Sequence, residues 1–160
     1  MASWKSEGID EFVNLCIFTD RQLANLIKRA IGKGGEVMGD AIGNVVRGLP
    51  VDDSSHHYGR RTSITSRQKD GLVESYGIAR VREKRWGWNV KIGFDGYNDI
   101  VTKRWPKGQP NAMVARSLNS GTSFLQKNPF MDTTVAANEA ATVEAIEQEF
   151  DKRLDRLWNK

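Results

Sequence analysis

The sequence has little of the residue types that most often build metal sites and disulfides. Its 160 residues include one cysteine, Cys16, and two histidines, His56 and His57. A single cysteine cannot form an internal disulfide and has no second thiol to complete a zinc site. The adjacent histidines point apart on either a helix or a strand, and no acidic or cysteine partner stands at ligand spacing. The sequence therefore predicts no metal site and no cofactor.

Long apolar runs and common catalytic patterns are also missing. No apolar stretch approaches the roughly 20 residues needed to cross a bilayer, and the opening MASWKSEGIDE lacks the hydrophobic centre of a signal peptide. We therefore expect a soluble protein with no membrane partner, made for the cytoplasm or for an assembly built there. No GxSxG, HExxH or DxDxDG pattern occurs, and Cys16 falls on an apolar helix face. The sequence predicts a protein that is not an enzyme.

The length and the apolar content fit one domain, at residues 1–160. Hydrophobic residues make up 39% of the chain, enough for one core of modest size. The patterns predict an α+β fold in which a long N-terminal helix and a C-terminal helix pack on an antiparallel sheet of three to four strands. The expected order is helical residues 8–49, antiparallel strands in 60–104, a loop-rich segment at 105–131 and a helix at 132–158.

The N-terminal helical region has two parts. Apolar spacing predicts a short amphipathic helix over residues 8–18, and residues 19–22 match a capping box that should begin a second helix. Apolar residues then recur every three or four positions until Pro50 ends the pattern. Two explanations stay open at Gly34-Gly35: the second helix continues through the pair, or the pair divides it into two shorter helices.

Glycines recur along this second helix. Gly35, Gly39 and Gly43 stand four residues apart and form one line along it, which Gly32 extends. Each interior glycine costs about 1 kcal/mol relative to alanine, so the line needs a compensating contact. A phosphate-binding loop is not indicated, because Lys33 precedes the glycine pair and no Ser or Thr follows it. Close approach of another helix or a neighbouring subunit would compensate, and the three glycines are the predicted subunit interface.

Strand signals are concentrated between residues 60 and 104. Residues 72–82 alternate loosely, whereas large apolar residues occupy every second position from Trp86 to Phe94 and share one face. The basic stretch 82–85 is short enough to connect a hairpin, and residues 95–99 are typical of a second turn. The pattern predicts a meander of three or four antiparallel strands.

The same region is basic. Lys and Arg outnumber Asp and Glu by 24 to 20, and most of the surplus lies in residues 60–107, near Tyr76 and several tryptophans. Cations beside aromatic side chains are typical of surfaces that bind nucleic-acid phosphates and bases. Arg82, Lys84 and Arg85 are the candidate contacts with DNA or another polyanion. The solvated face of a sheet whose other face is aromatic core explains the same pattern, and both explanations stay open.

The last third of the chain predicts one long helix. It should begin near Asp132 or Thr133 and end near Trp158, with acidic residues early and basic residues late, as the helix dipole favours. Residues 112–118 before it fit either a short helix or a strand.

Several short motifs follow one another in a fixed order. They are a Gly-hydrophobic-acidic-acidic-hydrophobic opening, a Pro-Val-Asp junction followed by a Gly and a Ser-Ile pair, a Gly-Thr pair, and a Pro-Phe pair ahead of the last helix. The residues that carry them are 8–12, Pro50, Val51, Asp52, Gly59, Ser63, Ile64, Gly121, Thr122, Pro129 and Phe130. This order, over about residues 8–158, resembles the minor tail component, or tail completion, family of long-tailed bacteriophages. Residues 53–58 are inserted relative to the family pattern, and residues 61–62 replace its usual leucine region.

The resemblance implies an α+β structural subunit of the phage neck with no catalytic residue. Such subunits form a ring, commonly of about six copies, that ends tail-tube growth or joins the tail to the head. The implied partners are further copies of the chain, the tail tube protein and the head-tail connector proteins, and packaged DNA would be met without sequence preference. The implied location is the virion neck or tail, after assembly in the host cytoplasm. The alternative is an α+β nucleic-acid-binding module that acts through its basic aromatic sheet face.

Overall fold

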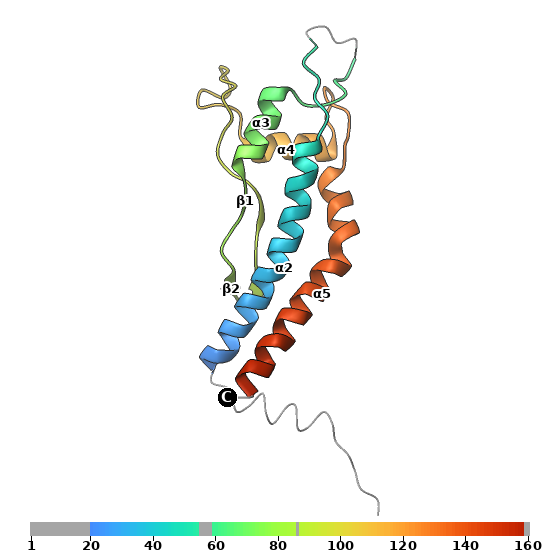
Figure 1. Ribbon diagram of the computed structural model, residues 1–160. Helices are drawn as coiled ribbons and strands as arrows, with labels where there is room; N and C mark the ends of the chain where they lie inside the picture. The colour runs from blue at the N-terminus through green and yellow to red at the C-terminus, as the bar shows by residue number, and fades with distance from the viewer. Residues whose placement is uncertain (1–19, 55–58, 86, 159–160) are drawn as a thin grey trace, which may run out of the picture.

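The computed structural model describes residues 20–54, 59–85 and 87–158 (Figure 1). Its helices are α2 (Asp20–Gly48), α3 (Ser66–Ser75), α4 (Asn111–Ser120) and α5 (Phe130–Trp158). Its strands are β1 (Tyr76–Ile78), β2 (Arg82–Lys84), β3 (Gly87–Asn89) and β4 (Ile92–Phe94). The predicted α+β class is confirmed, with a smaller sheet than expected. Residues 8–19, with the first predicted helix and the threonine of the capping box, lie outside the described residues.

Two long helices form the body of the molecule. α2 and α5 lie antiparallel and side by side, so the end of α5 is next to the start of α2 (Figure 1). α2 runs without a break through Gly34 and Gly35, so the explanation by two shorter helices is wrong. The physical reason is close packing: a Cβ atom placed on Gly34 would lie 2.7 Å from Cδ1 of Ile146 in α5. The bare backbone lets the two helices approach, and that contact offsets the low helix propensity of glycine.

The strands form one interrupted antiparallel hairpin. β1 pairs with β4, β2 pairs with β3, and the backbone N–H of Ala79 donates to the carbonyl of Lys91 between the two pairs. Three residues, 79–81, face two residues, 90–91, so the ladder shifts by one in the manner of a β-bulge. The four antiparallel strands match the predicted number, but their pairing is that of one hairpin, so the predicted meander order is wrong. The basic stretch 82–85 is also no simple connection, since β2 takes up residues 82–84.

Two further boundaries differ from the prediction. The segment predicted as strands over 60–104 contains helix α3, because the side chains of Thr65 and Gln68 form a capping box that starts a helix there. The segment 105–131 is not loop-rich throughout, since α4 occupies ten of its residues. α5 begins at Phe130, two residues before the predicted start at Asp132. None of the described helices combines the length and the apolar character of a membrane span.

The hydrophobic core lies where the end of α2 meets α3, α4 and the start of α5, in the upper half of Figure 1. Most of its side chains are less than 5% exposed, and the hairpin adds the partly buried Tyr76, Ile92 and Phe94 at its lower edge. The buried residues of this core are Ile42, Val46, Leu49, Ile64, Leu72, Val114, Ala115, Leu118 and Phe130.

Candidate functional site

The hairpin covers the glycine line of α2. A Cβ atom on Gly35 would lie 3.1 Å from a methyl group of Val90, and one on Gly43 would lie 3.2 Å from Cε1 of Tyr76. A Cβ atom on Gly39 would lie 2.9 Å from Cγ1 of Ile78, and the Tyr76 hydroxyl donates to the Gly39 carbonyl. All three glycines are buried within the single chain. The predicted subunit interface at Gly35, Gly39 and Gly43 is therefore wrong, because the chain's own hairpin fills the space left by the missing side chains.

The described segments that carry the motifs of the resemblance meet at the upper end of the molecule in Figure 1. We call residues 49–54, 59–65 and 121–129 the loop cluster. Val51 pairs with Ile64, and Arg61 pairs with Leu125, in two isolated parallel bridges. The Ser63 hydroxyl donates to the carbonyl of Pro50 at 2.6 Å. Two neighbouring segments and a third that is distant in the sequence are thus held together largely by their backbones.

Asp52 joins the first two of these segments. Its carboxylate accepts hydrogen bonds from the Ser54 hydroxyl at 2.5 Å and from the backbone N–H and hydroxyl of Thr62 at 3.1 and 3.0 Å. These hydrogen bonds, with that of Ser54 first, hold the pKa of the Asp52 carboxyl far below its usual range. The carboxylate therefore stays ionised at neutral pH and links segments 49–54 and 59–65 of the loop cluster.

The remaining motif residues shape the third segment. Gly121 has a φ of +75° and lies against Lys127, where a Cβ atom would be 3.0 Å from the lysine Cβ. The Thr122 hydroxyl accepts from the backbone N–H groups of Phe124 and Leu125 at 3.2 and 3.1 Å. Pro129 leads into α5, and Phe130 is 4% exposed in the core. All of these contacts are structural, and they fix where α5 begins.

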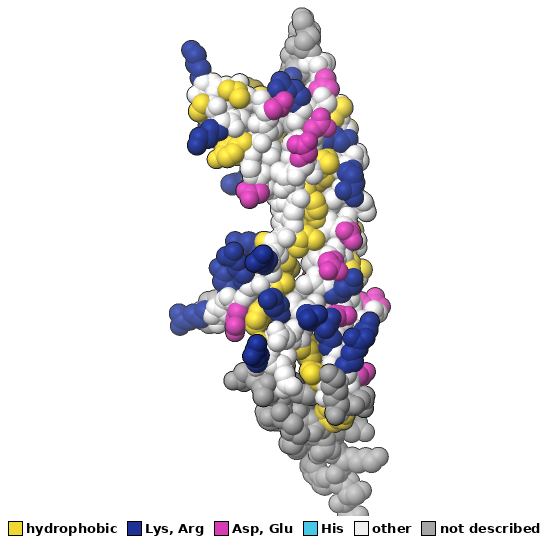
Figure 2. All heavy atoms as spheres, turned by 60° about the vertical axis from the view of Figure 1, so that its left-hand side comes forward, with side chains coloured by type: hydrophobic (Ala, Val, Ile, Leu, Met, Phe, Trp, Pro, Cys, Tyr) yellow, Lys and Arg dark blue, Asp and Glu magenta, His cyan; other side chains and the backbone are white. Residues whose placement is uncertain are grey.

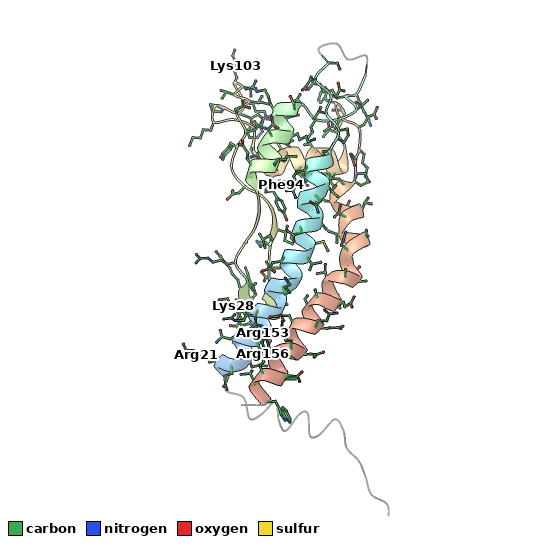
Figure 3. All side chains as sticks on the ribbon, in the orientation of Figure 1. Arg21, Lys28, Phe94, Lys103, Arg153 and Arg156 are labelled. Atoms are coloured by element: carbon green, nitrogen blue, oxygen red, sulfur yellow. The ribbon has the colours of Figure 1, made fainter. Side chains whose placement is uncertain are left out.

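The predicted basic aromatic surface is divided between the two ends of the molecule. Arg82, Lys84 and Arg85 are exposed on and after β2, at the lower end of the hairpin. Lys103 lies at the opposite end (Figure 3), close in sequence to the Arg104 guanidinium, which stacks 5.4 Å from the Trp105 ring centre. Tyr76 is used in packing against α2 and Phe94, so its ring is no platform for bases. Trp86 lies outside the described residues.

A cationic groove lies between the start of α2 and the end of α5. It has a volume of about 730 Å³, and Val81 of the hairpin forms part of its wall. Figure 3 shows Lys28, Arg153 and Arg156 close together there. The groove is lined by Asn25, Lys28, Arg29, Gly32, Lys33, Glu36, Val81, Glu149, Lys152, Arg153 and Arg156.

Most of the charge in this cationic groove is uncompensated. Lys33 pairs with Glu36 at 2.8 Å, and Arg153 pairs with Glu149. Within residues 20–54, 59–85 and 87–158, the other four cations of the groove, Lys28, Arg29, Lys152 and Arg156, form no ion pair. A concave surface with several unpaired cations attracts anionic groups such as phosphates. The groove therefore has the chemistry of a weak polyanion site.

Sequence reasoning did not find this groove. Its cations come from two helices more than a hundred residues apart, and only the antiparallel packing of α2 on α5 brings them together. The sequence does contain two basic clusters, at 28–33 and 152–156, but neither cluster by itself indicates a binding site. The described part of the chain holds no group of three or more His, Cys, Asp or Glu placed to bind a metal, and Cys16, His56 and His57 lie outside it.

No protein-family model, no curated protein and no solved structure matches the chain.

Proposed function

We propose that this chain is a structural protein of the neck of a long-tailed bacteriophage. It forms a ring with copies of itself, completes or terminates the tail, and joins the tail tube to the head-tail connector. It acts through assembly contacts and performs no reaction.

The observation that carries this proposal is the loop cluster. The motif residues that the structure describes come from positions 50–52, 59–64 and 121–130, and they meet at one end of the fold, whereas the opening motif at 8–12 lies outside the described residues. Motifs that matched by chance would have no reason to converge. Here the Pro-Val-Asp junction, the Gly-Thr pair and the Pro-Phe pair each make a defined structural contact, as a shared fold would require.

The test is removal of the gene from its phage, followed by electron microscopy of the lysate. We expect full heads separated from tails, with tails of abnormal length if the chain terminates the tube and of normal length if it only joins the parts. Supplying the intact chain from a plasmid should restore joined particles. Complete, infectious particles in its absence would overturn the proposal.

The cationic groove favours a second candidate function, non-specific binding of nucleic acid. Four unpaired cations in one concave surface can neutralise several phosphates, and none of the described side chains that line the groove is aromatic, so sequence preference is not expected. In a neck ring the same groove would meet passing DNA. In the alternative function, DNA or RNA binding by the monomer would be the activity itself.

Reversing two groove charges tests this binding. The double variant Lys28→Glu and Arg156→Glu should weaken binding of a short DNA duplex at least about tenfold, and the slope of log K against log salt should become shallower by about 2. Fluorescence anisotropy over a salt series measures both. The control, Lys103→Glu with Lys107→Glu, changes the net charge equally at the opposite end of the molecule. An equal loss in the control would show that net charge alone is responsible, and would count against the groove.

A further inference from the structure

The molecule separates its charges onto two flanks. Residues 76–91 of the hairpin contain five Lys or Arg and one acidic residue, whereas residues 130–151 of α5 contain six Asp or Glu and no Lys or Arg. Figure 1 shows the hairpin on one side of α2 and α5 on the other. Figure 2 shows one group of basic side chains over the hairpin and the neighbouring helix ends, and others at the upper end of the molecule. One flank is therefore basic, and the other is acidic along residues 130–151 of α5.

The acidic flank also carries exposed apolar side chains. Val135, Glu139, Val143 and Glu147 recur every fourth residue and so lie in one row on α5, which we call the α5 strip. All four are exposed, and Val135 and Val143 keep 42% and 47% of their surface in solvent. Exposed alanines lie beside the row on the side away from α2, and they leave the helix surface low there. They are Ala136, Ala137, Ala140 and Ala141.

The basic flank has a matching hollow. Tyr76 and Ile78 point towards α2, so the alternation along the strand turns Gly77 away from it. Gly77 pairs with Gly93, and a Cβ atom on either would meet no other atom within 4 Å. The hollow at this place has a volume of about 480 Å³, and its two charged lining residues are Lys91 and Asp95. The outer face of the hairpin is therefore shallow at Gly77 and Gly93, and exposed lysines and arginines lie further along the same hairpin.

From these surfaces we infer that the basic hairpin of one copy docks on the α5 strip of the next copy. The valines enter the shallow apolar surface of the hairpin, while Glu139 and Glu147 face its lysines and arginines. Since the two surfaces lie on opposite flanks of α2, they cannot contact each other within one molecule. The contact between copies is therefore head-to-tail. Repetition of a head-to-tail contact gives a ring when the rotation closes. The inference rests on the proposed ring function and names the surfaces that build it.

The inference gives the hairpin a protein partner in place of DNA. The α5 strip complements it in charge and supplies apolar side chains, which a phosphate backbone does not. Polyanion binding remains with the cationic groove, whose wall includes Val81 as its one contribution from the described residues of the hairpin.

A paired charge reversal tests the contact. One variant carries Glu139→Lys and Glu147→Lys, and the other carries Arg82→Glu and Lys84→Glu; all four side chains are exposed. Each variant alone then opposes like charges across the contact, and its self-association should weaken at least about tenfold. In an equimolar mixture each hairpin again faces an α5 strip of opposite charge, so association should return in alternating order. Mass photometry and sedimentation velocity over a concentration series give the dissociation constants.

The controls separate this contact from other effects. Lys103→Glu with Lys107→Glu should leave self-association unchanged, and circular dichroism should show that all variants are folded. Unchanged association of the single variants, or a mixture that fails to recover, would overturn the inference. So would loss of DNA binding by the hairpin variant with association intact, which would assign the hairpin to nucleic acid. None of these results changes the outcome expected from removal of the gene, so the proposed neck function is tested independently of this contact.

Discussion

Replacing Gly39 with leucine is expected to lower the free energy of unfolding by at least about 3 kcal/mol, and the midpoint of thermal unfolding by roughly 6 to 12 °C. The first added atom would already lie 2.8 Å from the Tyr76 hydroxyl oxygen and 2.9 Å from Cγ1 of Ile78. A leucine gains about 1 kcal/mol of helix propensity over glycine, but it forces the hairpin off α2 and disturbs the hydrogen bond from Tyr76 to the Gly39 carbonyl. Chemical and thermal denaturation followed by circular dichroism measure the change.

Gly48 supplies the matched control for this prediction. It is the last residue of the same helix, it is exposed, and no atom lies within 4 Å of a Cβ placed on it. Gly48→Leu should therefore change stability by less than about 0.5 kcal/mol, or increase it slightly. Equal stability of the Gly39 and Gly48 variants would contradict the packing of the hairpin on the glycine line. Loss of self-association with no loss of stability in Gly39→Leu would instead return these glycines to a subunit interface.

The glycine line shows how far sequence reasoning reaches for this fold. The spacing of Gly35, Gly39 and Gly43 correctly predicts that something packs against a bare helix face. The spacing does not identify the packing partner, because close approach by a strand, a helix or another subunit requires the same small residues at these positions. The answer depends on where the hairpin turns back, and that depends on a bulge at residues 79–81 that no pattern in the sequence marks.

Helix α3 was missed although its signal was present. Thr65 and Gln68 form a capping box of the kind used to predict the helix start at residue 19. The loose alternation of residues 72–82 outweighed it, and the true transition from helix to strand falls inside that stretch, between Ser75 and Tyr76. Apolar and polar residues alternate only in the later part of this stretch. Such a pattern fits a helix followed by a strand as well as it fits a single strand.

The charged surfaces were predictable only in part. Arg82, Lys84 and Arg85 stand together in the sequence and remain together on the hairpin. The groove and the α5 strip depend on the tertiary structure. The groove forms only because α2 and α5 pack antiparallel, and the α5 strip is a surface only because it lies on a face of α5 that α2 does not cover. Helical spacing shows that Val135 and Val143 share a face, but their exposure follows from which side α2 covers.

Replacing Phe130 with alanine is expected to destabilise the protein by about 3 to 5 kcal/mol. Its ring is 4% exposed, belongs to the main core and lies 6.5 Å from the ring of Phe94, centre to centre. It also starts α5, directly after the loop cluster. Truncation would leave a cavity at the point where the two long helices, α4 and the hairpin are tied together, so a single cooperative loss of structure is expected in urea denaturation.

Phe124→Ala is the matched control, because the same type of side chain is removed from within the loop cluster that Phe130 directly follows. Phe124 is 80% exposed, so the change should alter stability by less than about 0.5 kcal/mol. Its backbone carbonyl accepts from the N–H of Arg61 at 2.8 Å, and that hydrogen bond survives the substitution. If Phe130→Ala were no less stable than Phe124→Ala, the Pro-Phe motif would have no part in the core, and the structural support for the resemblance would fail with it. A stable Phe124→Ala chain that no longer restores joined particles would instead place an assembly contact on this exposed ring.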